Sequence, residues 1–152
     1  VETHAVDIDP ATSPRPTYVV DLAKAEETIP SNSYDCFLLP NTLCVLKDIE
    51  GALRNALRVL KPGGVILAST GVFVQLTGHE DDYWRLSAAG WRELANRAWP
   101  GCEVRIEQHG NCMTAVGAML GLSLEEFAPA ELDAHHHKYP VLVTLFCRKP
   151  LA

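Results

Sequence analysis

The segment RVLKPGGVILAST, residues 58–70, constrains the fold of this chain more than any other stretch. Lys61 places a cation where a helix would end, and Pro62 cannot continue that helix. Gly63 and Gly64 tolerate the positive φ that a sharp turn requires. The run that follows, VILAS, is continuously apolar, which is typical of a strand covered on both faces in a parallel sheet. The segment therefore predicts a helix-to-strand connection of an α/β domain.

Length and charge narrow the class of protein. The 152 residues are 47% hydrophobic, which is enough for a single domain with a buried core. The net charge of -6 and the lack of a Lys/Arg cluster argue against a nucleic-acid partner. No apolar run approaches the roughly 20 residues of a membrane span, and no charged-then-apolar leader opens the chain. We therefore expect a cytoplasmic protein with no membrane partner.

The cysteines and a histidine triplet do not form a metal-binding pattern. The five cysteines are odd in number, contain no CxxC pair and mostly have apolar neighbours, so we interpret them as buried, reduced side chains. His135, His136 and His137 are consecutive, so their side chains would point in different directions on any regular element. We therefore expect no metal site.

The pattern of apolar residues predicts alternating strands and helices. Helices are expected after the capping residues Asp48 and Ser87, and a third after either Asn111 or Thr114. Strands are expected where apolar runs lie between turn-forming segments. The predicted strands cover residues 3–8, 17–22, 34–40, 65–69, 102–109 and 139–149, and the predicted helices cover 49–61, 88–99 and 114–122. This order predicts one α/β domain over residues 1–152, with a mainly parallel sheet, helices on both faces and an antiparallel last strand.

Segments in this order resemble a known enzyme family. VDIDP, VVDLAKAEETIPSNSYDCFLLPNTL and DIEGALRNALRVLKPGGVILAST are similar to class I S-adenosylmethionine-dependent methyltransferases. DDYWRLSAAGWREL, HGNCMTAVGAMLG and ELDAHHHKYPVLV resemble a type 11-like bacterial subgroup that is often found beside or fused to glycosyltransferases. The resemblance covers essentially the whole chain. It implies a Rossmann-like fold, S-adenosylmethionine as cofactor, and a small-molecule or glycan-related methyl acceptor.

Acidic residues follow the first two predicted strands, at the edge where an open parallel sheet binds its ligands. A carboxylate at Asp7 or Asp9 can accept hydrogen bonds from both hydroxyls of a ribose. The resemblance favours Asp7 for this role and implies that Asp21 binds the adenine amino group. It also implies that the N–H of Leu22 meets a ring nitrogen of adenine and that Asn41 lines the methionine part of the cofactor. The alternative for each acid is a turn residue at the end of a strand, and Asp9 would then begin the turn that follows it.

The family's first strand and its glycine-rich loop have no counterpart ahead of VDIDP. The missing strand would lie between the strand of Asp7 and the strand at residues 34–40, and its loss would leave backbone groups unpaired. Three outcomes are open: the chain is a fragment of a longer protein, the first strand moves into the vacancy, or a second copy pairs there in a homodimer. The expected fold is therefore truncated at its N-terminal strand, and each outcome affects cofactor affinity.

The loop TGHEDDYWR, residues 77–85, follows the fourth predicted strand on the same edge of the sheet. His79 is the candidate general base, and Tyr83 and Arg85 are the candidate acceptor-binding residues. Tyr83 and Trp84 would form an apolar wall beside the ring of an acceptor, or they would pack the next helix against the sheet. For Trp84 we favour the packing role.

Two functions from different classes remain open. The retained acids favour a methyltransferase that modifies a small-molecule or glycan-related acceptor. The missing glycine loop favours a non-catalytic, methyltransferase-like module that self-associates or binds a partner chain. The sequence does not identify the methyl acceptor, because acceptor pockets in this fold are built from variable loops.

Overall fold

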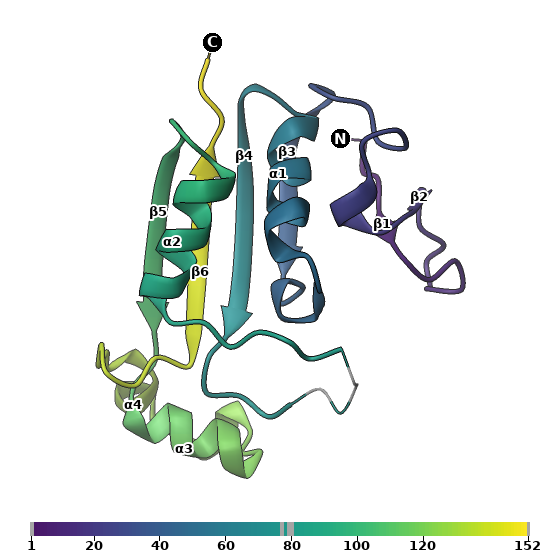
Figure 1. Cartoon of the computed structure of the whole chain (residues 1–152). Coiled ribbons are helices and arrows are strands. Elements are labelled where there is room, and N and C mark those ends of the chain that lie inside the picture. Colours follow the sequence, from purple (N-terminus) through teal and green to yellow (C-terminus); the bar gives the residue numbers. More distant parts are fainter. Residues whose placement is uncertain (1, 77, 79–80, 152) are drawn as a thin grey trace.

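The computed structural model describes residues 2–76, 78 and 81–151, and its centre is a four-stranded sheet (Figure 1). The strand order is β3-β4-β6-β5, with β3 parallel to β4 and β6 antiparallel to both of its neighbours. Three strands therefore run in one direction, and the last strand lies between two of them in the opposite direction. This confirms the α/β, Rossmann-like fold and the antiparallel last strand. The four strands are β3 (Tyr34–Pro40), β4 (Leu60–Gly71), β5 (Glu103–His109) and β6 (Leu142–Arg148).

The first two strands form a separate two-stranded parallel sheet. β1 (Val6–Asp7) pairs with β2 (Tyr18–Val19), and both are shorter than the sequence predicted. β1 does not pair with β3, so the expectation that the first strand moves into the vacancy is wrong for this structure. The strand has only two residues, which offer few backbone groups for a second hydrogen-bonded neighbour, and the side chains of His4 and Tyr18 contact Tyr34 of β3 instead.

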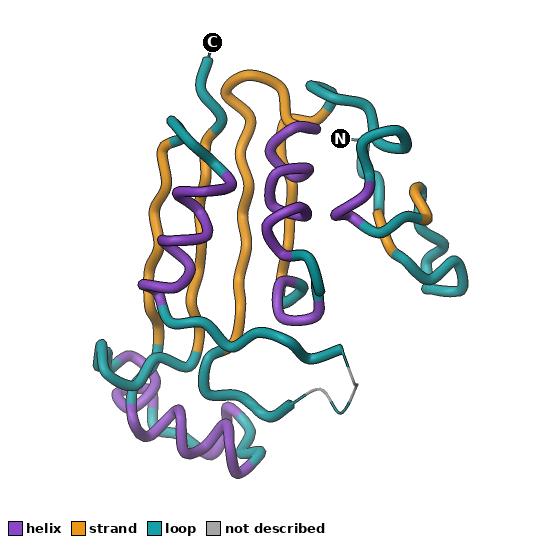
Figure 2. Tube along the Cα trace, viewed as in Figure 1, coloured by secondary structure: helices purple, strands orange, loops and turns teal. Residues whose placement is uncertain are grey.

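Capping residues define where the two long helices begin. The Asp48 carboxylate accepts a hydrogen bond from the N–H of Gly51 at 2.9 Å, and the Ser87 hydroxyl accepts one from Gly90 at 3.4 Å. Both caps were predicted from the sequence. None of the described helices has the length and hydrophobicity to cross a membrane. The helices are α1 (Ile49–Val59), α2 (Ala88–Ala98), α3 (Cys112–Leu120) and α4 (Pro129–Asp133), with the short 3-10 turns η1 (Leu22–Lys24), η2 (Leu43–Val45) and η3 (Leu124–Glu126) (Figure 2).

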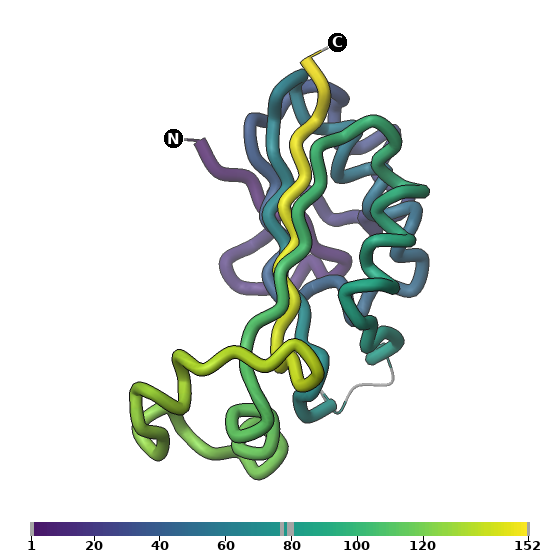
Figure 3. The backbone as a smooth tube through the Cα atoms, turned by 90° about the vertical axis from the view of Figure 1, so that its left-hand side faces the viewer, coloured from purple at the N-terminus to yellow at the C-terminus, as the bar shows by residue number. Residues whose placement is uncertain are grey.

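The long helices α1 and α2 lie on the same face of the sheet, whereas α3 and α4 extend past its end (Figure 3). Side chains on the helix face of the strands, such as Ile66 and Leu145, are buried. On the other face, Leu38 is 63% exposed and Leu67 is 44% exposed. The expectation of helices on both faces therefore holds for one face only within the described residues. The connection from β1 to β2 could have supplied a helix there, but it carries three prolines and forms none.

The two glycines of the Lys-Pro-Gly-Gly turn are required for different reasons. Gly63 has a φ of +78°, as the sequence predicted, but Gly64 does not have a positive φ. A Cβ on Gly64 would instead lie 2.9 Å from the carbonyl oxygen of Lys61 and 3.2 Å from that of Asp35. The prediction of positive φ at Gly64 is therefore wrong, because glycine is required there by the close approach of backbone oxygens, one in the same turn and one in β3, rather than by conformation.

The cysteines are all free thiols, but they do not share one environment. Cys44 and Cys147 are buried, as expected, whereas Cys36 and Cys112 are exposed. Cys36 lies on the open face of the sheet beside Leu38, so its apolar neighbours in the sequence do not indicate burial.

Candidate functional site

Two acids expected to bind the ribose lie at the end of β1. Asp7 is the last residue of β1, and its Oδ1 accepts a hydrogen bond from the N–H of Asp9 at 3.0 Å. Its Oδ2 has no hydrogen-bond donor among the residues that the structure describes. Asp9 lies past the strand, and its Oδ1 accepts a hydrogen bond from Ala11 at 2.8 Å. Asp9 therefore stabilises the turn that follows it, whereas Asp7 keeps one carboxylate oxygen available for a ligand.

The end of β2 presents a carboxylate beside a backbone donor. Asp21 caps η1: its Oδ1 accepts a hydrogen bond from the N–H of Ala23 at 3.0 Å, and its Oδ2 lies 3.9 Å from Lys24 Nζ. Leu22 is buried, and its N–H has no acceptor among the described residues. The packing of η1 against α1 fixes this turn on the body of the domain. A hydrogen-bond acceptor and a hydrogen-bond donor thus lie next to each other in the chain, as the edge of a purine requires.

Asn41 directly follows the end of β3 and reaches across to β4. Asn41 has a φ of +51°, a left-handed conformation that asparagine adopts more readily than most residues. Its N–H donates to the carbonyl oxygen of Ser69 at 2.9 Å, and its Oδ1 lies 3.5 Å from the Ser69 hydroxyl. The sequence analysis missed Ser69, although a Ser-Thr pair directly after an apolar strand is a signal for polar groups at a carboxyl edge. Thr70 is fully buried, and its hydroxyl has no partner among the described residues.

The loop after β4 lies against the turn that follows β3. The N–H groups of Tyr83 and Trp84 both donate to the carbonyl oxygen of Cys44, at 2.9 and 3.2 Å. The Trp84 ring packs against the core and its Nε1 donates to the carbonyl oxygen of Leu46 at 2.8 Å, which confirms a packing role for this side chain. The Tyr83 hydroxyl donates to Asp81 at 2.7 Å, and the ring is 42% exposed.

Arg85 is held in the same loop by an ion pair. Its guanidinium pairs with Asp82, whose side chain is only 4% exposed. The hydrogen bonds that its guanidinium donates to Asp82 raise the pKa of Arg85, with a smaller contribution from the neighbouring Cys44. Arg85 therefore holds the loop in its own conformation through Asp82 and the carbonyl oxygen of Trp84. His79, the candidate base, lies outside the described residues.

The structure brings the candidate residues together in two groups. Asp7 and Asp21 belong to the β1–β2 sheet, whereas Asn41, Tyr83 and Arg85 lie at the carboxyl end of β3 and β4. No hydrogen-bonded strand connects these groups in the described chain.

A cluster at the amino end of β3 links the two sheets instead. The Tyr34 hydroxyl lies 2.7 Å from His4 Nδ1 and 2.8 Å from the Tyr18 hydroxyl. Burial, together with the hydrogen bond between the Tyr34 and Tyr18 hydroxyls, raises the pKa of Tyr34 to about 12. Side chains rather than backbone hydrogen bonds therefore join β1 and β2 to β3 in the described chain.

The described part of the chain contains no arrangement of side chains suited to bind a metal ion. No group of three or more His, Cys, Asp and Glu side chains there could hold a metal ion. The groups at the carboxyl ends of β1, β2 and β3 are carboxylates, an amide and a backbone N–H. These are groups that recognise ribose hydroxyls and a purine edge.

The strand order and the single antiparallel strand define the Rossmann-like fold found in S-adenosylmethionine-dependent methyltransferases. A methyltransferase from Archaeoglobus fulgidus shares this fold with a TM-score of 0.62 and 10% identity, over 95% of this chain and 74% of that one. Residues 2–68 match the family model of the methyltransferase domain. A search of curated proteins found no match.

Two further structures show how far this fold extends beyond one activity. The [4+2]-cyclase SpnF has a TM-score of 0.58 and 20% identity, over 88% of this chain and 55% of that one. A Haloferax volcanii methyltransferase, solved in complex with its Trm112 activator, has a TM-score of 0.55 and 18% identity, over 86% of this chain and 60% of that one. The chain thus spans less than two thirds of either protein, and this likeness shows the fold alone.

Proposed function

We propose that residues 1–152 form the C-terminal portion of a class I methyltransferase that transfers a methyl group from S-adenosylmethionine to a small-molecule or glycan-related acceptor. The observation that carries this proposal is the family match over residues 2–68, because that segment contains Asp7, Asp21 and Asn41. Each of these residues lies at or just after the carboxyl end of a strand, the edge where this fold binds its ligands.

The groups at this edge fit the parts of the cofactor. Asp7 keeps Oδ2 available for the ribose hydroxyls, and Asp21 with the N–H of Leu22 would hold the adenine. Asn41 would contact the methionine part, and Asp9 would support Asp7 through the turn that it caps. When bound, the cofactor supplies an electrophilic methyl group.

The loop after β4 would provide the acceptor side of the site. Tyr83 exposes its ring at this edge, and Arg85 would position the loop through its ion pair with Asp82. His79 is our candidate for the base that takes a proton from the acceptor. Because methyl transfer is a displacement, positioning the acceptor would supply much of the acceleration.

Calorimetry with S-adenosylhomocysteine tests the cofactor site, and the full-length protein is the appropriate sample. Asp7→Ala and Asp21→Ala each remove a charged hydrogen-bond partner, so binding should weaken by about 10- to 150-fold, which corresponds to about 1.5 to 3 kcal/mol. Asp35→Ala is the matched control, because Asp35 lies at the amino end of β3 and its side chain is 84% exposed. Equal losses in all three variants would contradict the assigned roles.

The second candidate function is a non-catalytic module that binds a second copy or a partner chain. It is favoured by the free edges of β1 and β3 and by the exposure of Leu38 and Leu67 on the open face. Pairing of these edges in a symmetric homodimer would cover that backbone. Sedimentation velocity across micromolar concentrations should then give a dimer that Leu38→Asp dissociates. A stable monomer, together with tight binding of S-adenosylhomocysteine by the full-length protein, would reject this candidate.

A further inference from the structure

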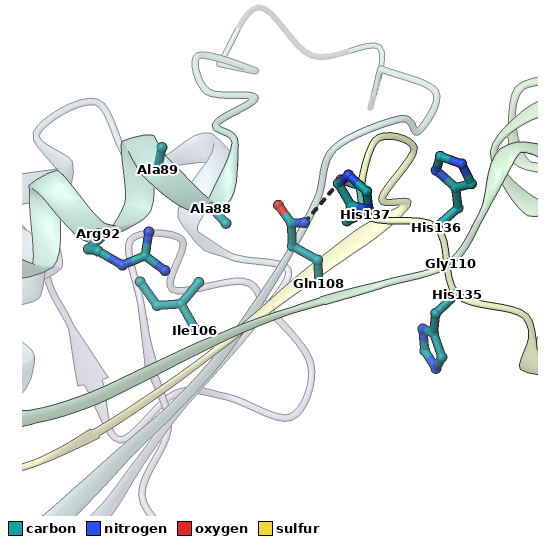
Figure 4. A pocket seen from close by; sticks show the side chains of 9 residues that line it. All are labelled: Ala88, Ala89, Arg92, Ile106, Gln108, Gly110, His135, His136 and His137. Atoms are coloured by element: carbon teal, nitrogen blue, oxygen red, sulfur yellow. Dashed lines mark hydrogen bonds between the residues drawn. The ribbon is translucent and has the colours of Figure 1, made fainter.

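A pocket of about 500 Å³ lies between the start of α2, the end of β5 and the segment that precedes β6 (Figure 4). It is formed by α2 and β5, and none of the residues assigned to the cofactor or the acceptor lines it. Ala88 and Ala89 from α2 and Ile106 from β5 give it apolar walls, and the histidine triplet lies at its other end. The pocket is therefore a distinct feature of the fold that the proposed activity does not use.

Arg92 contributes a positive charge with no counter-ion. Its side chain extends from α2 toward Ile106 and Gln108 (Figure 4), and it makes no ion pair or hydrogen bond with the described residues. Arg97 on the same helix differs, since its guanidinium lies 3.6 Å from Glu50 and 3.8 Å from Glu93. No Asp or Glu is among the described residues that line the pocket. An arginine that lacks a carboxylate partner beside a pocket is suited to bind an anion from solution.

The start of α2 adds backbone donors to the same pocket. Ser87 caps the helix by accepting from Gly90, which leaves the N–H groups of Ala88 and Ala89 without an acceptor in the described chain. Both residues line the pocket, and α2 is three turns long, so its dipole also favours negative charge at this end. The backbone and Arg92 therefore favour the same class of ligand.

Hydrogen bonds hold the histidine segment in place across the pocket. Gln108 Nε2 donates to the carbonyl oxygen of His137 at 3.1 Å, and the N–H of His136 donates to Gly110 at 3.0 Å. The rings of His136 and His137 are stacked, with centroids 5.5 Å apart, and His136 also contacts Tyr139. The two imidazoles thus present N–H donors from an ordered segment. His135 extends from the opposite side of the chain, as Figure 4 shows, so the triplet does not converge on one point.

We propose that this pocket binds the oxyanion group, phosphate or carboxylate, of a small organic molecule. Arg92 would bind two oxygens of the group. The α2 N–H groups and the His136 and His137 imidazoles would donate to the remaining oxygens of a phosphate, or to the second lone pairs of the two oxygens of a carboxylate, and Ile106 would contact the carbon skeleton. The proposal concerns binding alone and does not depend on methyl transfer. A metal ion is a poorer fit, because no three ligand side chains converge in the described residues.

Amide chemical shifts test the proposal on the chain as it stands. Titration with inorganic phosphate, glycerol phosphate and succinate at constant ionic strength should give saturable shifts of Ala88, Ala89 and Gly110. Stronger binding of one compound identifies phosphate or carboxylate as the preferred group. Arg92→Gln should weaken this binding by tenfold or more, and Arg92→Lys, which keeps the charge but not the paired donors, by a smaller factor.

Arg97→Gln is the matched control, because Arg97 shares the helix and the solvent exposure of Arg92 but lies outside the pocket. It should bind as the unmodified chain does. The amide spectrum of each variant shows directly whether the domain is folded, and His136→Gln with His137→Gln gives a second test that leaves α2 unchanged. Shifts that do not saturate, or that are equally weakened in Arg92→Gln and Arg97→Gln, would overturn the proposal.

Discussion

Replacement of Gly64 by alanine tests whether β3 and β4 are as closely packed as the structure shows. A Cβ at this position would lie 2.9 Å from the carbonyl oxygen of Lys61 and 3.2 Å from that of Asp35. Both oxygens belong to the backbone, so neither can rotate away as a side chain would. The turn at residues 61–64 would have to open and β4 to move away from β3, and overpacking of this kind costs about 1 to 3 kcal/mol of unfolding free energy. We expect a destabilisation in that range for Gly64→Ala.

Gly101→Ala separates this steric effect from backbone strain. Gly101 has a φ of +76°, and a Cβ there would meet no atom within 4 Å, so its substitution costs only the left-handed strain of about 1 to 2 kcal/mol. Gly64 has the opposite combination, with close contacts and no positive φ. A third variant, Gly64→Val, places two further methyl groups at the same position as Gly64→Ala. It should lower the unfolding free energy by more than Gly64→Ala does.

Urea denaturation followed by circular dichroism measures these differences through the transition midpoint at constant slope. Thermal midpoints should follow, at about 2 to 4 °C for each kcal/mol in a domain of this size. A Gly64→Ala variant with an unchanged midpoint, alongside a destabilised Gly101→Ala, would show that the close approach of β3 and β4 is wrong. A changed dependence of the unfolding free energy on urea concentration would instead indicate that the substitution altered the compactness of the folded or the unfolded state.

Three further outcomes follow from groups outside the site. The unfolding free energy should decrease as pH rises from 10 through 12, because folding raises the pKa of Tyr34 from 10.0 to about 12 and the unfolded state loses its proton first. Burial also raises the pKa of the Cys147 thiol, so Tyr34→Phe should reduce the decrease rather than abolish it. Asn111→Ala removes four hydrogen bonds to backbone groups and should lower the unfolding free energy by about 2 kcal/mol in urea titrations. A thiol reagent should modify Cys36 and Cys112 in the native protein but Cys147 only after urea unfolds it, as peptide mass mapping would show.

Local signals in the sequence predicted the helices well. Asp48 and Ser87 were identified because a side-chain cap depends on residues within one turn. At α3 the two alternatives proved to be one motif, since Asn111 accepts from the N–H of Thr114 while the Thr114 hydroxyl accepts from the N–H of Asn111. The apolar run VILAS likewise predicted a strand at the middle of β4, but it is buried on one face only, since Ile66 and Ala68 are buried whereas Leu67 is 44% exposed.

Features that depend on distant parts of the chain were not predictable in the same way. The sequence did not show that α1 and α2 share one face, because which face a helix covers is set by its crossover and not by its own pattern. Asn41 was expected at the cofactor edge, but its contact with Ser69 joins residues 28 positions apart. The pocket at Arg92 is lined by three segments that are far apart in the sequence. The histidine triplet could not be recognised as part of a binding site from the sequence, because β5 and α2 complete that site only in the folded protein.

The position of β6 between β4 and β5 has a consequence for the order of folding. β4 ends at Gly71, whereas its neighbour in the sheet begins at Leu142, so this pairing closes a long loop and contributes to slow folding. Until β6 pairs with them, β5 has no hydrogen-bonded neighbour among the described strands, and the sheet consists of β3 and β4 alone. During synthesis the nascent chain would therefore expose the apolar faces of α2 and β5 until its last strand leaves the ribosome. Chaperone binding should concentrate in that interval.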